Sequence, residues 1–166
     1  MIFGMTPLTF IHVLISLIGI LSGAAVLVGL LAGKRLDAWT TIFLSTTVLT
    51  SITGYFFPFH KLLPSHIIGA VSLLALAVAL VARYAKNMAG PWRRTYVISA
   101  MLAFYLNVFV LIFQAFLKRA ALHALAPTQS EPPFLISQIV VMIAFIILTI
   151  IAVKRFSMRS SVLAVS

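Results

Sequence analysis

Charged residues are confined to a few positions, and this leaves five long uncharged stretches. The stretches cover residues 1–33, 38–60, 62–82, 95–117 and 132–153. An α-helix rises about 1.5 Å per residue, so roughly 20 apolar residues cross the hydrocarbon of a bilayer, which is about 30 Å thick. Each stretch is long enough to cross once. The spacing therefore predicts an all-α integral membrane bundle of five transmembrane helices.

The expected helices occupy residues 8–32, 39–59, 65–84, 93–117 and 133–154, in a single transmembrane domain over 1–166. Pro7, Pro64, Pro91 and Pro133 fall at the expected starts, where a missing amide hydrogen costs little. Composition agrees, because 63% of the residues are hydrophobic and 8% are charged, against about 25% charged in soluble domains. The first stretch lacks the basic segment of a signal peptide, so we expect it to be a retained helix.

Basic residues are distributed unequally between the two sides that five crossings define. One side receives Lys34, Arg35, Arg83, Lys86, Arg93, Arg94, Lys154, Arg155 and Arg159. The other receives Lys61, Lys118 and Arg119. Cytoplasmic loops carry the excess of Lys and Arg, so the pattern predicts a bacterial inner-membrane protein with its N-terminus outside and its C-terminus cytoplasmic.

The same distribution bears on partners. The net charge of +10 is spread over helix ends instead of one folded face, which argues against a nucleic-acid partner. The lipid bilayer is the expected partner, and other membrane subunits or a homo-oligomer remain open.

All four histidines fall at expected periplasmic helix ends, namely His12, His60, His66 and His123. Two glutamines lie about one turn inside the same end, and Glu131 lies just above it. Polar groups at membrane depth usually face the bundle interior and are often functional. We therefore predict a ligand-binding site formed by His12, His60, His66, Gln114 and Gln138. Residues 119–132, which hold His123 and Glu131, form the longest expected connection and are longer than the usual two to eight residues.

Helical spacing predicts which way these residues point. A stripe of small residues continues from His12 through Ser16, Gly19 and Gly23, at steps of four, three and four. Such stripes let membrane helices approach closely, so His12 should face the bundle. A second stripe runs through Thr46, Thr50, Thr53, Phe57 and His60, and Asn107 shares a helix face with Gln114.

Several ligands fit these residue types. Two imidazoles on facing helices can ligate the iron of haem b, with His12 and His66 the first pair to consider and His60 the substitute. A divalent metal such as zinc or copper can instead use His60, His66, His123 and Glu131. Histidines that titrate near neutral pH can also relay protons or bond a quinone carbonyl beside Gln114 and Gln138. Cysteine is absent, which excludes disulfides, thiolate metal sites and iron–sulfur clusters.

Other classes of function remain open. No nucleotide-binding loop, nucleophile elbow or paired carboxylates occur, so no catalytic residue is assigned and an enzymatic role is undecided. One alternative is a non-catalytic accessory or assembly subunit whose polar layer only joins helices through bonds to backbone carbonyls. A small transporter or channel needs a continuous polar path, and the nearly all-aliphatic cytoplasmic halves of the third and fifth helices argue against one.

Four segments carry a resemblance to a family of small bacterial multi-pass inner-membrane proteins. They are residues 53–60 (TGYFFPFH), 63–66 (LPSH), 122–127 (LHALAP) and 130–134 (SEPPF). The resemblance covers nearly the whole chain and implies a fold and a location, but no activity. The chain is more loosely similar to small four-helix b-type cytochromes, in size and in having membrane histidines. Those proteins pair haem histidines across helices, whereas no matched pair is expected here at mid-membrane depth.

The orientation can be tested with a reporter enzyme that is active only in the periplasm. Fused after Ser166 it should be silent, because the basic asymmetry places the C-terminus in the cytoplasm. Fused after Ser130, in the connection before the last helix, it should be active. Activity of the Ser166 fusion would contradict the predicted orientation.

Overall fold

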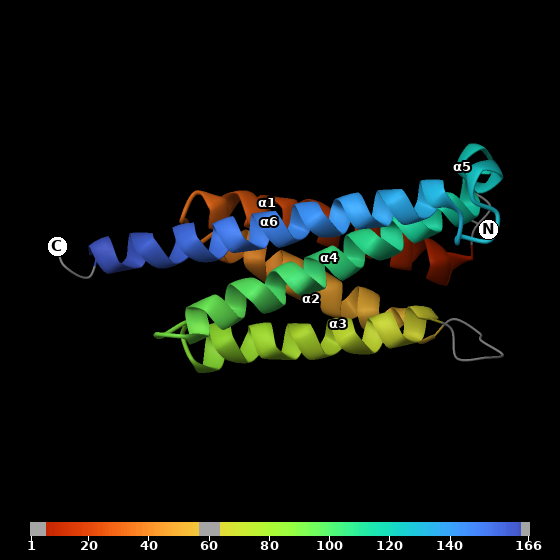
Figure 1. Cartoon of the computed structure of the whole chain (residues 1–166). Coiled ribbons are helices and arrows are strands. Elements are labelled where there is room, and N and C mark those ends of the chain that lie inside the picture. Colours follow the sequence, from red (N-terminus) through yellow and green to blue (C-terminus); the bar gives the residue numbers. More distant parts are fainter. Residues whose placement is uncertain (1–5, 57–63, 164–166) are drawn as a thin grey trace.

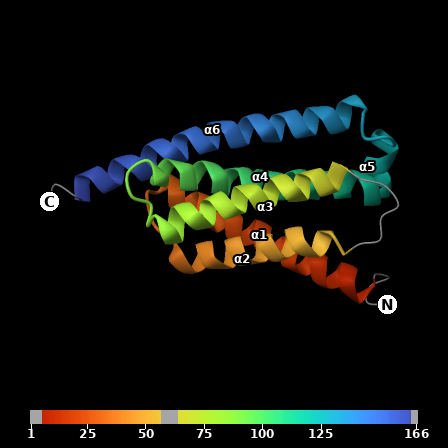
Figure 2. The ribbon, with the colours of Figure 1, turned by 90° about the horizontal axis from the view of Figure 1, so that it is seen from below.

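A computed structural model describes residues 6–56 and 64–163, and this part of the chain is all-helical. Its elements are α1 (Pro7–Leu31), α2 (Asp37–Gly54), α3 (Pro64–Leu80), the π-helical turn η1 (Val81–Ala85), α4 (Trp92–Lys118), the short α5 (Ala120–Leu125) and α6 (Pro132–Leu163). The long helices run side by side and alternate in direction (Figure 1). Helix α4 is central because it packs against α1, α2, α3 and α6. Figure 2 shows α6 along one side of the bundle and α2 along the opposite side.

The predicted helix boundaries agree best with the structure where an uncharged stretch ends at charged residues. Helices α1 and α4 match the predicted 8–32 and 93–117 to within one residue at each end. Helix α6 continues to Leu163, nine residues beyond its predicted end, because residues 154–163 contain no glycine or proline to stop it. Helix α2 ends at Gly54 instead of residue 59, and residues 57–59 lie outside the described part. The connection predicted over residues 119–132 contains the short helix α5, so the prediction of a loop throughout was wrong.

Four of the described helices are long and apolar enough to span a membrane. They are Pro7–Leu31, His66–Ala85, Trp92–Lys118 and Pro132–Ser157. This supports a membrane protein whose apolar helices contact the lipid bilayer. Helix α2 is not among them, because six threonines and two serines lower its hydropathy. Five spans therefore stay a prediction.

Helix α2 buries hydroxyl groups as well as apolar side chains, and it exposes several large apolar ones. Thr40 and Thr47 are buried beside Phe43 and Leu44, whereas Trp39, Leu49 and Ile52 are exposed. Buried hydroxyls together with exposed large apolar side chains are unusual for a helix on the surface of a soluble protein. A lipid environment explains it, because hydrocarbon accepts the exposed apolar side chains while the bundle interior supplies partners for the hydroxyls.

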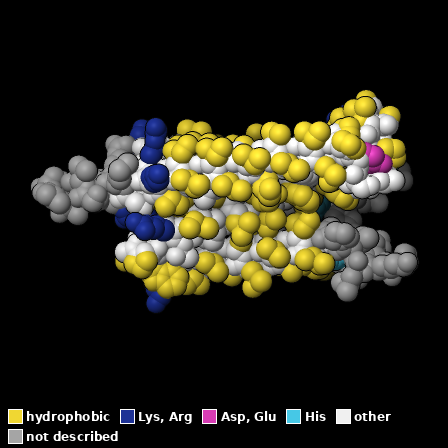
Figure 3. Space-filling model, viewed as in Figure 1, with side chains coloured by type: hydrophobic (Ala, Val, Ile, Leu, Met, Phe, Trp, Pro, Cys, Tyr) yellow, Lys and Arg dark blue, Asp and Glu magenta, His cyan; other side chains and the backbone are white. Residues whose placement is uncertain are grey.

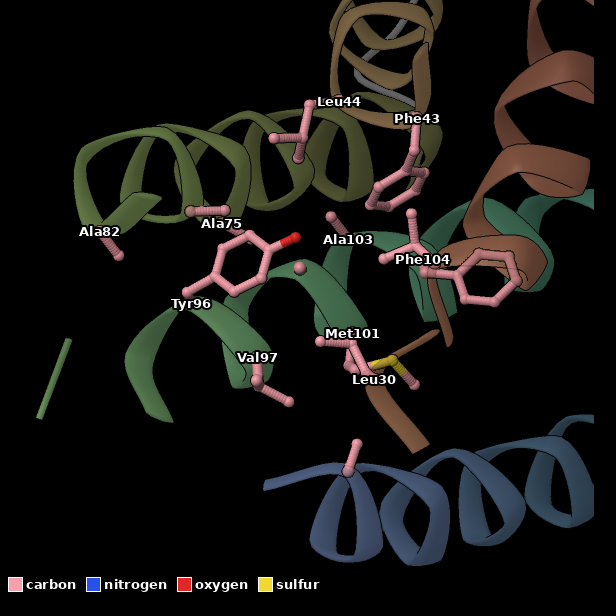
Figure 4. Close-up of a cluster of buried hydrophobic side chains, with 14 of the residues drawn as sticks. Leu30, Phe43, Leu44, Ala75, Ala82, Tyr96, Val97, Met101, Ala103 and Phe104 are labelled. Atoms are coloured by element: carbon pink, nitrogen blue, oxygen red, sulfur yellow. The ribbon is translucent and has the colours of Figure 1, made fainter. Parts of the chain in front are cut away.

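The interior is built around Phe43 of α2 and Tyr96, Val97 and Phe104 of α4, all of them buried (Figure 4). Much of the outer surface is apolar, as Figure 3 shows on one face. Helix α6 is the most exposed of the four candidate spans. Within its apolar 18-residue segment 11% is buried, against 33–39% in the corresponding segments of the other three. The bundle thus has a core of buried side chains and a wide apolar exterior.

The small-residue stripe on α1 faces inward, which confirms its predicted role. Gly19 and Gly23 are both buried. A Cβ added at Gly23 would lie 2.7 Å from the Phe104 ring and 3.1 Å from the Phe43 ring. Helix α1 can approach these two rings only because this position has no side chain.

Gly23→Leu should therefore disrupt the association of α1 with α2 and α4. Overpacking at such a contact costs about 1–3 kcal/mol of stability, which should appear as a lower thermal unfolding temperature in detergent. Leu21→Ala, at a residue of the same helix that is 70% exposed, is the control and should unfold near the wild-type temperature. Unchanged unfolding of Gly23→Leu would show that the stripe does not form this contact.

Candidate functional site

His12 of α1 is held by the last turn of α2. Its Nδ1 lies 2.8 Å from Thr53 Oγ1, and the Thr53 hydroxyl donates its single hydrogen to the carbonyl of Leu49 at 2.7 Å. The hydroxyl must then accept from the ring, so His12 donates its Nδ1 hydrogen. In the neutral tautomer that donates from Nδ1, the lone pair is on Nε2. The predicted inward direction of His12 is confirmed.

His66 of α3 is held by Tyr55, the residue that follows the end of α2. Its side chain is buried, its ring centre lies 5.6 Å from that of Tyr55, and the Tyr55 hydroxyl donates to the His66 carbonyl at 2.7 Å. Residues two apart on a helix point in directions about 200° apart. Thr53 and Tyr55 therefore hold the two imidazoles on opposite sides of the end of α2.

The two glutamines lie on α4 and α6. Gln138 is buried, and its Nε2 donates to the carbonyl of Phe109 at 3.2 Å, across the α4–α6 contact. The Oε1 atoms of Gln138 and Gln114 are buried without a hydrogen-bond partner. Buried polar atoms are nearly always paired in proteins, so both oxygens are positions where a donor would bind favourably.

Glu131 and His123 belong to the segment between α4 and α6. The Glu131 carboxylate accepts from the amide and hydroxyl of Thr128, at 3.0 and 2.8 Å, and from the amide of Ser130 at 3.1 Å. Desolvation is the largest single influence on the pKa of this carboxyl and raises it, but these hydrogen bonds together outweigh it, so the pKa is below its ordinary value. His123 is an exposed residue of α5. The carboxylate thus closes the loop that precedes α6.

The described residues contain no group of three or more His, Asp or Glu side chains placed to hold a metal ion. His60, which belongs to both predicted ligand sets, lies outside the described residues. The structure therefore brings His12 and His66 to the same helix end but places Gln138 at a different interface.

A row of polar groups continues from His12 into the bundle between α1, α2 and α4. Ser16 donates to the His12 carbonyl at 2.8 Å and lies 3.5 Å from Thr50 Oγ1. Further in, Thr47 Oγ1 and Asn107 Nδ2 lie 3.3 and 3.2 Å from the point where a Gly19 Cβ would stand. We name this row, His12, Ser16, Thr47, Thr50, Thr53 and Asn107, the polar seam. Thr47 Oγ1 and Asn107 Nδ2 are buried and have no hydrogen-bond partner.

An ion pair between a buried arginine and an exposed aspartate, at the opposite end of the bundle, was not predicted. Arg83, in the π-helical turn η1, has a side chain that is 4% exposed and is paired with Asp37 at the start of α2. The guanidinium also lies 5.3 Å from the Tyr96 ring centre and 5.6 Å from that of Tyr84. Asp37 is one of only two acidic residues in the chain, and that rarity is the one sequence signal that pointed to it.

Removal of the two partners of this ion pair should have unequal effects. Asp37→Asn leaves a buried guanidinium without its counter-charge, which should cost about 1–3 kcal/mol, a value reduced for the solvent that reaches Asp37. Arg83→Met keeps the length of the side chain and leaves a carboxylate whose side chain is 67% exposed, so its cost should be smaller. Thermal unfolding in detergent measures both. An Arg83→Met variant less stable than Asp37→Asn would contradict this account of the pair.

No family model matches the chain, and no curated protein and no solved structure is significantly similar to it.

Proposed function

We propose that the chain is a five-helix protein of the bacterial inner membrane whose periplasmic end binds a metal ion or haem iron through His12. Four helices meet the length and composition needed to span a membrane. Helix α2 is packed alongside them between α1 and α3 and exposes large apolar side chains, among them Trp39, Leu49 and Ile52. Its 18 residues extend about 27 Å, close to the thickness of the hydrocarbon core.

The proposed orientation is supported by where the basic side chains lie. Figure 3 shows Lys and Arg gathered at the end of the bundle toward which α6 runs. Eight basic residues of the described part belong to this end, which we name the basic end: Lys34, Arg35, Arg83, Lys86, Arg93, Arg94, Lys154 and Arg155. Lys118 and Arg119 belong to the other end. The positive-inside rule makes the basic end cytoplasmic and the histidine end periplasmic.

The hydrogen bond from His12 to Thr53 is the observation that carries the ligand proposal. Metal-binding histidines usually donate their second ring nitrogen to a protein oxygen, which orients the ring and directs the other lone pair at the metal. The hydrogen bond between His12 Nδ1 and Thr53 matches this arrangement, in which Nε2 would be the atom that binds the metal. A quinone carbonyl needs a hydrogen-bond donor and is a poorer match for this tautomer.

Further ligands to the same ion remain proposals. His60 follows the end of α2 by six residues and precedes His66 by six, so the chain can bring it toward either ring. Gln114 and Gln138 offer buried amide oxygens, and His66, His123 and Glu131 complete the predicted set. The structural observations support His12 most directly, because its ring is oriented by the hydrogen bond to Thr53.

Metal analysis and an absorption spectrum of the purified protein test this proposal. We expect a bound divalent metal or haem that is lost in His12→Ala. Thr53→Val removes only the oxygen that orients the ring and should weaken binding by about 10–100-fold, the usual effect of removing such a partner. Leu21→Ala is the control, because Leu21 lies on the same helix as His12 but is 70% exposed on the outer surface, and it should retain the ligand. A wild-type protein that binds zinc, copper and haemin no better than His12→Ala would rule out the proposed site.

A second candidate is an accessory subunit of a larger membrane complex, and the surface of α6 favours it. This helix exposes a continuous row of large apolar side chains, among them Leu135, Ile139, Ile143, Ile146 and Ile150. Such a face can contact lipid or the helices of another subunit. A ligand-free protein that migrates in mild detergent as part of a defined larger complex would favour this candidate.

A further inference from the structure

We propose that the polar seam is a water-filled entry that opens at the histidine end and is closed in mid-bundle by Phe43 and Phe104. The ligand is water, bound as a hydrogen-bonded row between His12 and Asn107. The inference rests on the proposed function for the side of the membrane on which the entry opens, and it does not depend on a metal.

Thr47 is the first reason to place water in the seam. Two neighbouring threonines of α2 donate to their own helix, Thr46 to the Ile42 carbonyl at 2.7 Å and Thr53 to the Leu49 carbonyl at 2.7 Å. Thr47 is 1% exposed and its hydroxyl has no such bond. Leaving a buried hydroxyl unpaired costs about 1–3 kcal/mol. A bound water removes this cost.

Asn107 supplies the second polar atom at the same level of the bundle. Its Nδ2 is also buried without a partner and faces Gly19 together with Thr47 Oγ1. Buried waters typically make about three hydrogen bonds to otherwise unpaired polar groups. An unpaired amide and an unpaired hydroxyl from facing helices are such groups, and no larger ligand is needed to satisfy them.

The polar groups continue from this point to the histidine end. On α4, Gln114 and Lys118 follow Asn107 at steps of seven and four residues, which keeps all three on one helix face. The Gln114 Oε1 atom is again buried and unpaired, and Lys118 interacts electrostatically with His12. On the opposite side of the seam, Thr50 of α2 lies close to Ser16, and Thr53 is hydrogen-bonded to His12. Unpaired polar atoms thus occur at two levels of one row that leads outward.

Apolar rings end the seam one helical turn further in. Phe43 and Phe104 are 1% and 5% exposed and pack edge to face with ring centres 5.9 Å apart, as Figure 4 shows. Gly23 of α1 lies against both rings, and Phe104 continues to Phe145 of α6 at 5.1 Å. This layer extends across the contact between α1, α2, α4 and α6.

Beyond the rings lies the second polar region, at the basic end. Tyr96 is hydrogen-bonded to Thr40 and interacts with Arg83, which pairs with Asp37. Polar groups therefore approach the Phe43–Phe104 layer from both ends. The layer is the position at which water from the two sides is kept apart.

The natural absence of cysteine makes single-cysteine labelling the appropriate experiment. Thr47→Cys and Asn107→Cys probe opposite walls of the seam independently, so the seam is tested even where one variant fails to fold. Thr40→Cys probes the region beyond the rings. Leu49→Cys is the matched control, because Leu49 lies on the same helix and is 48% exposed on the apolar outer surface. A charged, membrane-impermeant methanethiosulfonate is applied from the periplasmic side.

We expect Thr47→Cys and Asn107→Cys to react on the order of tenfold or more faster than Leu49→Cys, because only a hydrated thiol ionises to the reactive thiolate. Thr40→Cys should not react from this side. In a Thr40→Cys/Phe104→Ala double variant it should react, because the ring that separates it from the seam is gone.

The outcomes separate this inference from the proposed orientation. Ser130→Cys, in the loop before α6, reports which side the histidine end faces. If Ser130→Cys reacts from the periplasm while neither seam cysteine reacts faster than Leu49→Cys, the seam is dry and the inference is overturned. Reaction of Thr40→Cys from the periplasm with Phe104 intact would overturn the closure. If Ser130→Cys and the seam cysteines all react only from the cytoplasmic side, the entry is upheld and the proposed orientation fails.

Discussion

The inward polar face of α2 is the constraint on which the rest of the structure depends. From one end to the other it pairs Asp37 with Arg83, Thr40 with Tyr96, Thr50 with Ser16, and Thr53 with His12. Each pair joins α2 to a different neighbour or to a different level of the same one. Hydrocarbon offers these groups no hydrogen-bond partners, so hydroxyls directed inward are stabilised by partners in the bundle or by bound water. The neighbours of α2 are consequently arranged around it by polar contacts as well as by packing.

Arg83 is a charged group that is buried in this arrangement and stabilised by its partners. A guanidinium that is almost fully buried costs several kcal/mol unless a counter-charge and further contacts stabilise it. Here the π-helical turn η1 widens the helix at the residue concerned, and two tyrosine rings lie beside the charge. Single π-helical turns inside α-helices are uncommon and often occur at functional positions. The turn and the ion pair together fix the register of α3 against the start of α2.

The sequence predicts the helices because a bilayer imposes a length on uncharged segments, and α1 and α4 agree with that expectation almost to the residue. It also predicts that His12 faces inward, because the spacing of Ser16, Gly19 and Gly23 defines a helix face. It does not reveal the Asp37–Arg83 pair, since partners 46 residues apart leave no local pattern. Nor does it reveal that Thr53 and Tyr55 direct His12 and His66 to opposite sides of α2, because that depends on where the helix ends.

The polarity of α2 also has a consequence for how the protein enters its membrane. Transfer of a helix into lipid is judged segment by segment, and threonine-rich segments are weakly favoured compared with leucine- or isoleucine-rich ones. If α2 spans the bilayer, its entry is best coupled to that of α1, to which it is joined by a short turn in which Gly33 adopts a left-handed conformation. The pair can then leave the translocation machinery as one hairpin, with the hydroxyls of α2 already covered by α1. The tight α1–α2 connection is in this sense an element of biogenesis, because it supplies the less apolar helix with a partner before it meets lipid.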